Sequence, residues 1–286
     1  MKNLNHYTGN CLDFHKKTVD SKHNTQEFPD YKEKIQNLED RINERFCIYD
    51  ELFIINSLEI INDSPFTNDE KVNLLKLYSY KSKIIQTLKR DITTTASHRI
   101  INTCPNCTIS EINSFDHYVP KEQFPEFVVN PKNLFPSCTI CNGYKNKIWR
   151  DNNQKRFLNL YLDQLPNIQF LYVNLSFVGD IVVTDFYLDN PEELIDAKLF
   201  GIIKNHYNNL HLLDRFNNGI NEIVTSFEHT IKSFGQNITT EELSHLVINK
   251  SNQDRIAFGY NFWKSILEIE LAKNMNYLNR ILDRHV

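Results

Sequence analysis

A chain of 286 residues with 41% hydrophobic and 24% charged side chains can bury a substantial core and has the composition of a globular protein. Its formal net charge of −4 gives no overall attraction to nucleic acid, so such contact would need a local patch. Only 7 glycines are present, and there is no signal-peptide core or apolar run that could span a membrane. We therefore expect a helix-rich cytoplasmic protein with no membrane partner.

The N-terminal part of the sequence predicts two amphipathic helices. Residues 1–26 are polar and show no clear period, so we expect a loose arm there. Over Tyr31–Ile61, apolar residues recur at steps of three and four, which is typical of a helix with one buried face. The segment Thr67–Glu70 has a capping-box pattern, with Thr at the N-cap and Glu three residues later. It predicts the start of a second helix that ends near Asp91.

Four of the 6 cysteines form two Cys-x-x-Cys pairs, Cys104/Cys107 and Cys138/Cys141. In a chain without a secretion signal, this usage favours metal binding over disulfides. Two such turns can supply four thiolates to one tetrahedral ion, which predicts one Zn²⁺ per chain. Four protein ligands leave no open coordination position, so we expect this zinc to be structural. The alternative is a set of four buried thiols in a reduced core.

Between and just after these pairs lie Asp116 and His117, which are adjacent, and two asparagines, Asn133 and Asn142. The segments that carry them read FDHYVPK, NPKNLFPSC and CTICNGYK. In this order, framed by the cysteine pairs, they resemble the HNH nuclease family and its ββα-metal fold. The resemblance is confined to the stretch Cys104–Trp149.

The resemblance implies a role for each residue. His117 would be the general base that takes a proton from water, a task that suits an imidazole titrating near neutrality. Asp116 and Asn142 would bind the catalytic metal ion, and Asn133 would hold the loop that orients the histidine. Many family members have His where this chain has Asn142. A carboxylate and an amide oxygen form an oxygen-only donor set, which favours Mg²⁺ or Mn²⁺.

Each of these residues taken singly has an ordinary structural interpretation, as a loop carboxylate, a core histidine or a turn residue. Their combined spacing favours catalysis. The segment that follows is locally basic, with five basic residues and Asp151 as its acidic member. The basic residues are Lys145, Lys147, Arg150, Lys155 and Arg156. We expect the first three to contact phosphates, whereas an exposed helix face explains the last two equally well.

The C-terminal part begins with a segment rich in β-branched and aromatic residues, 166–188, with Gly179-Asp180 at its centre. This pattern predicts a β-hairpin. From Pro191 onward the apolar spacing is helical, and we expect breaks near Gly235 and near Asn249–Asn252.

The predicted fold class is therefore α+β and mainly helical. An HNH-like domain at 99–152 is flanked by an N-terminal helical region at 1–98 and a C-terminal hairpin-plus-helical region at 153–286. The predicted function is a metal-dependent endonuclease that hydrolyses phosphodiester bonds, with double-stranded DNA as the expected substrate. For stand-alone proteins with this motif, the resemblance also implies a bacterial effector in antiviral defence, acting beside a partner ATPase or sensor subunit. Two alternatives stay open: a catalytically silent zinc-dependent nucleic-acid binding module, and an RNase that uses the same residues.

Overall fold

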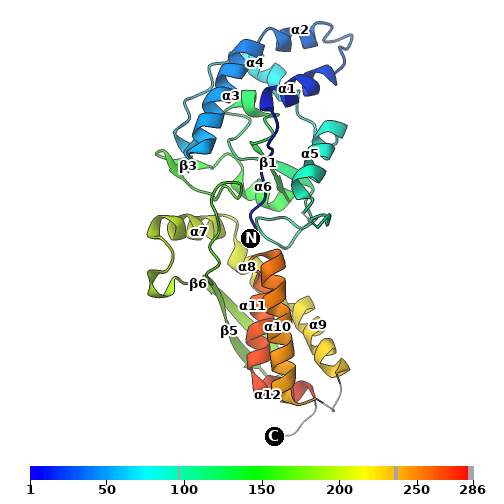
Figure 1. Ribbon diagram of the computed structural model, residues 1–286, viewed down its shortest axis with the longest axis vertical. Helices are drawn as coiled ribbons and strands as arrows, with labels where there is room; N and C mark the ends of the chain where they lie inside the picture. Colours follow the sequence, from blue (N-terminus) through cyan, green and yellow to red (C-terminus); the bar gives the residue numbers. More distant parts are fainter. Residues whose placement is uncertain (96, 235–237, 283–286) are drawn as a thin grey trace. The chain divides into compact units, whose positions relative to one another are not determined.

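The computed structural model describes residues 1–95, 97–234 and 238–282. Within these residues the protein is mixed α/β and about half helical, and its strands form three separate two-stranded antiparallel sheets (Figure 1). The α+β class predicted from the sequence is thus confirmed at this level. None of the described helices combines the length and the apolar character that crossing a membrane requires.

The chain divides into two compact units. The first unit spans Asn3–Gln164, and the second consists of Met1–Lys2 together with Leu165–Val286. The helices of the N-terminal region and the cysteine-rich stretch thus share the first unit, while the predicted boundaries near residues 98 and 152 remain predictions. The elements of the first unit are α1 (Cys11–Asp20), α2 (Tyr31–Gln36), α3 (Glu39–Ile54), η1 (Leu58–Ile60), α4 (Asn68–Leu75), α5 (Lys83–Thr93), β1 (Ser114–His117), η2 (Pro125–Phe127), β2 (Leu134–Ser137), α6 (Thr139–Lys145), β3 (Arg150–Asp151) and β4 (Gln154–Lys155).

Helix α1 lies where the sequence predicted a loose arm, so that prediction is wrong. The side chain of Asn10 caps the helix by accepting a hydrogen bond from the backbone N–H of Asp13 at 2.9 Å. The buried face follows a helical period and consists of Cys11, Phe14, His15, Thr18 and Val19. Because polar residues occupy part of this face, a search for apolar periodicity does not find the helix.

Each of the two predicted helices is divided in the structure. The capping box at Thr67 is confirmed, since Glu70 Oε2 accepts from the Thr67 N–H at 2.7 Å and Thr67 Oγ1 accepts from the Glu70 N–H at 3.4 Å. Helix α4 nevertheless ends at Leu75. The hydroxyl of Ser82 then caps α5 by accepting from the Ile85 N–H at 3.4 Å. Likewise, the predicted helix after residue 30 is split into α2, α3 and η1.

Strands β1 and β2 and helix α6 together form the centre of the first unit. The two strands pair antiparallel, with Ser114 opposite Ser137 and His117 opposite Leu134. Every residue of β2 is buried. Helix α6 starts directly after this strand, with Cys138 as its N-cap, and it contacts β1. A strand, a second strand and a helix therefore converge at the cysteine pairs.

The second unit confirms the predicted hairpin as β5 and β6, joined at Gly179-Asp180. Strand β5 contacts α11, and β6 contacts α8 (Figure 1). Helix α10 continues through the predicted break at Asn249–Asn252, because its buried face runs through Val247 and Ser251 while the asparagines lie outside it. The predicted break at Gly235 lies outside the described residues. The elements of this unit are β5 (Leu171–Val178), β6 (Ile181–Leu188), η3 (Pro191–Glu193), α7 (Ala197–Asn209), α8 (Leu212–Asn218), α9 (Ile220–Ser233), α10 (Thr240–Phe258), α11 (Trp263–Lys273) and α12 (Met275–Ile281).

Candidate functional site

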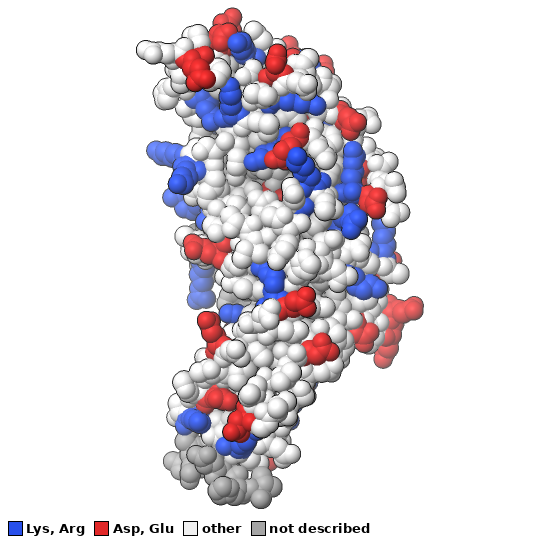
Figure 2. Space-filling model, turned by 180° about the vertical axis from the view of Figure 1, so that it is seen from behind, with Lys and Arg blue, Asp and Glu red and all other residues white. Residues whose placement is uncertain are grey.

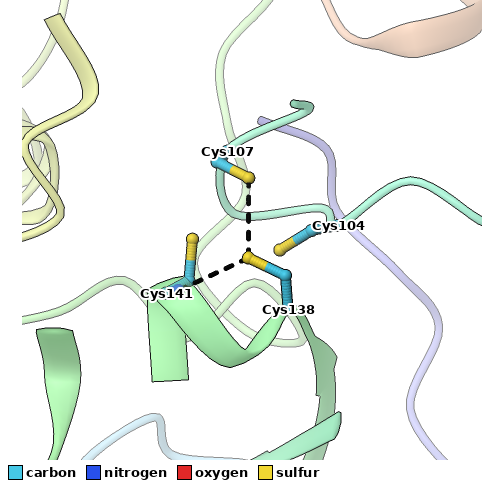
Figure 3. A group of neighbouring side chains, drawn as sticks. All are labelled: Cys104, Cys107, Cys138 and Cys141. Carbon is cyan, nitrogen blue, oxygen red and sulfur yellow. Dashed lines mark hydrogen bonds between the residues drawn. The ribbon is translucent and has the colours of Figure 1, made fainter. Parts of the chain in front are cut away.

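The four paired cysteines converge on one point. Their sulfur atoms all lie within 4.8 Å of one another, and all four residues are buried (Figure 3). The first pair sits on a tight turn closed by a hydrogen bond from the Thr108 N–H to the Cys104 carbonyl at 2.8 Å. The second pair opens α6, where Cys138 Sγ accepts from the Cys141 N–H at 3.4 Å. All four thiols are free of disulfides.

This arrangement fits a tetrahedral zinc ion. With zinc–sulfur bonds of about 2.3 Å, ligand sulfurs lie roughly 3.8 Å apart, and Cys107 Sγ is 3.9 Å from Cys138 Sγ. Hydrogen bonds among the four thiols lower the pKa values of Cys107 and Cys138, that of Cys138 to about 6, and raise those of Cys104 and Cys141. The four buried cysteines could hold a zinc ion because their sulfur atoms converge on one point.

Asp116, on β1, forms a buried ion pair with Lys145 at the end of α6. Lys145 Nζ is 3.0 Å from Asp116 Oδ1 and also donates to the backbone carbonyl of His117 at 2.8 Å. Burial raises the pKa of the Asp116 carboxyl, and the ammonium of Lys145 opposes that rise. The pair therefore holds the C-terminal end of α6 against β1 and keeps a cation beside this carboxylate.

His117 follows Asp116 on β1 and is likewise only 6% exposed. Its Nε2 lies 2.9 Å from the backbone carbonyl of Val128. A carbonyl oxygen can only accept, so the ring hydrogen is on Nε2 and the lone pair of a neutral ring is on Nδ1. Burial lowers the pKa of His117 to about 3, and the charge of Lys121 acts in the same direction. Burial thus favours the neutral form of the ring in this closed arrangement, and the role of His117 as a base titrating near neutrality stays a prediction.

Asn133 connects the segments on both sides of it. Its side chain accepts from the Val119 N–H at 2.8 Å and donates to the carbonyls of Val119 at 3.0 Å and Phe127 at 3.2 Å. Tyr49, on α3, adds a donor to its Oδ1 at 3.3 Å. The fully buried carboxamide thus ties the chain after β1 to η2. Among the described residues, its side chain forms no hydrogen bond with Asp116 or His117.

Asn142 lies on α6, the same helix as Lys145. Its Nδ2 donates to the backbone carbonyl of Phe115, the residue before Asp116, at 3.3 Å. An amide that donates through nitrogen turns its oxygen away from that bond and leaves it as an acceptor. The structure thus brings Asn142 beside β1, as it does Lys145.

The basic segment does not form one uniform surface. Lys147 is exposed, whereas Lys155 is buried in an ion pair with Asp163 at 3.0 Å. Arg150 Nη1 donates to the carbonyls of Glu59 and Ile61, each at 2.8 Å. On the face drawn in Figure 2, basic and acidic side chains are interspersed. The expected phosphate contacts of Lys145, Lys147 and Arg150 remain predictions, and Lys147 has the most accessible position of the three.

Three residues near the site were not predicted from the sequence. The ring of Tyr78 meets the ring of His117 edge-on, with centroids 4.7 Å apart. Arg45 of α3 and Glu126 of η2 form a buried ion pair at 3.0 Å. The division between α4 and α5 places Tyr78 in a connecting segment, and no local pattern indicated that break. The Arg45–Glu126 pair joins residues far apart in sequence, for which a single sequence carries no signal.

Comparison with known proteins gives two similar chains. The protein ea31 of Escherichia phage lambda is 26% identical over 230 residues, which cover 75% of this chain and 76% of that protein. The Septu protein PtuB of Bacillus thuringiensis is 34% identical over 64 residues, 21% of this chain and 24% of PtuB. The match thus spans about a quarter of PtuB. No protein-family profile matches the chain, and no solved structure does.

Proposed function

We propose that this protein is a metal-dependent endonuclease of the HNH type. The observation that carries the proposal is the arrangement around β1. Asp116 and His117 are adjacent on this strand, the His117 ring is oriented by Val128, and Asn142 reaches the strand from α6. An oriented imidazole, with a carboxylate and an amide carried by the same strand and the helix against it, is a set of groups suited to phosphodiester hydrolysis.

The donor chemistry fits two different metals. The four thiolates suit one structural Zn²⁺, which would join the turn at Cys104 to the start of α6. Asp116 and Asn142 offer oxygen donors, which suit Mg²⁺ or Mn²⁺. Lys145 already engages Oδ1 of the Asp116 carboxylate. A divalent ion bound there would stabilise the charge that develops on the leaving 3′ oxygen.

The protein's own residues divide the remaining work. His117 holds its hydrogen on Nε2 through Val128 and would take a proton from the attacking water on Nδ1. Asn133 fixes the segment that carries Val128 by bonding Phe127. Hydrolysis in this sense leaves a 5′ phosphate and a 3′ hydroxyl. Because Asp116 and His117 are each 6% exposed, DNA reaches them only after neighbouring side chains move, and Tyr78 is the ring that lies against His117.

A role in antiviral defence, beside a partner ATPase or sensor subunit, is the second part of the proposal. This part is supported by the HNH-like sequence motif at Cys104–Trp149 and by the partial match to Septu protein PtuB. The longer match, to a protein of phage lambda, gives it no support. The proposed role in defence is therefore independent of the proposed nuclease activity, and each needs its own test.

One experiment tests the enzyme. The full chain is incubated with plasmid, linear duplex, single-stranded DNA and RNA, each with Mg²⁺, Mn²⁺ or EDTA, beside His117→Ala as control. We expect DNA cleavage that needs the divalent ion and that His117→Ala lowers by roughly 100-fold or more, the usual effect of losing a positioned base. Cleavage of RNA alone would favour the RNase alternative. DNA binding without cleavage under every metal would favour the silent binding module.

A further inference from the structure

The His117 ring is bonded to a residue that directly follows the short helix η2. Within the described part of the chain, the His117 ring forms one hydrogen bond, to the backbone carbonyl of Val128. The Val128 N–H in turn donates to the Pro125 carbonyl at 3.2 Å within that turn. Any rotation of η2 would therefore move the acceptor that sets the tautomer and plane of the imidazole.

Glu126, the central residue of η2, is completely buried and both its oxygens are bonded. Oε1 accepts from Arg45 Nε at 3.0 Å, and Oε2 accepts from the Ser64 hydroxyl at 2.7 Å. Arg45 comes from α3, and its Nη2 donates to the Asn62 carbonyl at 2.7 Å. The carboxylate is thus held from two segments of the N-terminal helical region.

Stability alone does not account for this pair. Removing two charges from water costs about as much as their attraction returns, so a buried ion pair often adds nothing over an apolar pair of the same volume. What the pair does supply is one defined geometry. The Arg45 guanidinium also lies 5.5 Å from the centre of the Phe127 ring. The Phe127 ring is tilted by 55° against that of Tyr49, which lies on α3 like Arg45, with ring centroids 4.8 Å apart.

We propose that Arg45 and Glu126 are positioning residues for His117. They fix η2 against α3, η2 presents the Val128 carbonyl, and that carbonyl keeps the hydrogen of His117 on Nε2. The N-terminal helical region is then part of the catalytic apparatus, although none of its residues in this chain of contacts touches the reacting atoms. This inference rests on the proposed function for its kinetic consequence, but its structural consequence is measurable without activity.

The test replaces both charges together. Arg45→Met with Glu126→Leu removes the pair without leaving an unpaired buried charge, so the protein should fold and keep its zinc. We expect kcat on DNA to fall roughly tenfold or more, as for a misplaced catalytic group, while KM stays within about twofold. In ¹⁵N spectra of the histidine rings, assigned with His117→Gln, the His117 signals should shift from the pure Nε2–H tautomer toward a mixture.

A matched control uses another buried ion pair of the same unit, one that lies outside the proposed site. Lys155 and Asp163 are both 6% exposed at their side chains and lie 3.0 Å apart. The other hydrogen bonds of the two side chains go to Asn56 and to the Asn159 N–H, and none goes to η2. Lys155→Met with Asp163→Leu should therefore leave kcat and the His117 ring signals unchanged, even where it lowers the melting temperature as much as the test variant does.

Two outcomes would overturn the inference: a folded double variant with wild-type kcat and unchanged His117 signals, or an equal loss of kcat in the control. If the wild-type protein cleaves nothing, the proposed function fails, and the ring spectra alone decide whether the pair positions His117. If the double variant does not fold, Ser64→Ala keeps the ion pair and removes one bond to Glu126. It should shift the same ring signals, and unchanged signals would count against the inference.

Discussion

Lys145 Nζ lies 3.0 Å from Asp116 Oδ1, and this pair joins the end of α6 to β1 inside the first unit. Both side chains are nearly excluded from solvent, at 5% and 8% exposure. The cysteine cluster holds the start of the same helix. Helix α6 is therefore attached at one end by thiols and at the other by an ion pair, and Asn142 lies between these attachments.

Replacing Lys145 by Met should destabilise the protein. Asp116 would remain buried without a counterion, and breaking one side of such a pair costs about 3 kcal/mol or more of unfolding free energy. The pKa of Asp116 should rise further, because the charge of Lys145 now opposes its rise. Urea unfolding at neutral pH measures the loss. A wild-type unfolding curve would show that the ion pair is not formed in solution.

Lys147→Met is the matched test of phosphate contact, because this lysine is exposed and two residues away. It should leave the unfolding free energy within about 0.5 kcal/mol of wild type. If Lys147 binds a phosphate, the slope of log K against log salt should become shallower by about one unit. Lys232→Met, in the second unit, serves as a charge-matched control. Equal slopes for all three proteins would place the DNA contact elsewhere.

Removal of one cysteine ligand should unfold the first unit. Cys104→Ser or Cys141→Ser leaves three thiolates for the zinc, and structural zinc contributes directly to folding free energy. We expect the metal content to fall from about one zinc per chain toward zero, with loss of helical signal in circular dichroism. Cys47→Ser is the control, because Cys47 is exposed and outside the cluster. Soluble wild-type protein without zinc would contradict the prediction.

Metal ligands and the base should respond differently to substitution. Asp116→Ala and Asn142→Ala remove oxygen donors, so part of the lost cleavage rate should return when Mn²⁺ is raised. His117→Ala removes the proton acceptor, which no metal concentration replaces. The comparison is a titration of rate against Mn²⁺ for each variant, with zinc content measured in parallel. Recovery of the His117→Ala rate by Mn²⁺ alone would remove the distinction between base and ligand.

Because of His15, the free energy of unfolding should decrease as the pH is lowered below 6.5. Burial lowers its pKa from 6.5 to about 4, so the unfolded chain takes up a proton before the folded one. Its contribution is fully present above pH 6.5 and is lost as pH falls from there toward 4, at about 1.4 kcal/mol per unit. Urea unfolding between pH 7.5 and 4.5 measures this slope.

The substitution His15→Leu should flatten the slope over that window, because its side chain has no proton to bind. His23→Gln is the control, since His23 is exposed on the same N-terminal segment. An unchanged pH slope in His15→Leu would mean that other groups cause the acid sensitivity.

Features that depend on short spacings could be predicted from the sequence. Two Cys-x-x-Cys turns predicted the sulfur cluster, the Thr67–Glu70 pattern predicted a helix start, and Gly179-Asp180 between β-branched runs predicted the hairpin. The helix start and the hairpin depend on contacts between residues close in the chain. The sulfur cluster joins two distant pairs, but each pair has the spacing of metal-binding cysteines. Such signals are readable without knowing the fold.

Which polar residues are buried, and which partners they pair with, depends on the tertiary structure. From the sequence, Lys145 was expected to be a phosphate-binding cation of the basic segment, but it forms a buried pair with Asp116. Arg45 likewise pairs with Glu126, which is distant in the sequence. The burial of His15 on α1 could not be predicted either, because it also depends on packing against distant parts of the chain. Long-range pairs form because the packed core removes both partners from water at once, and that coincidence depends on the whole fold rather than on any local pattern.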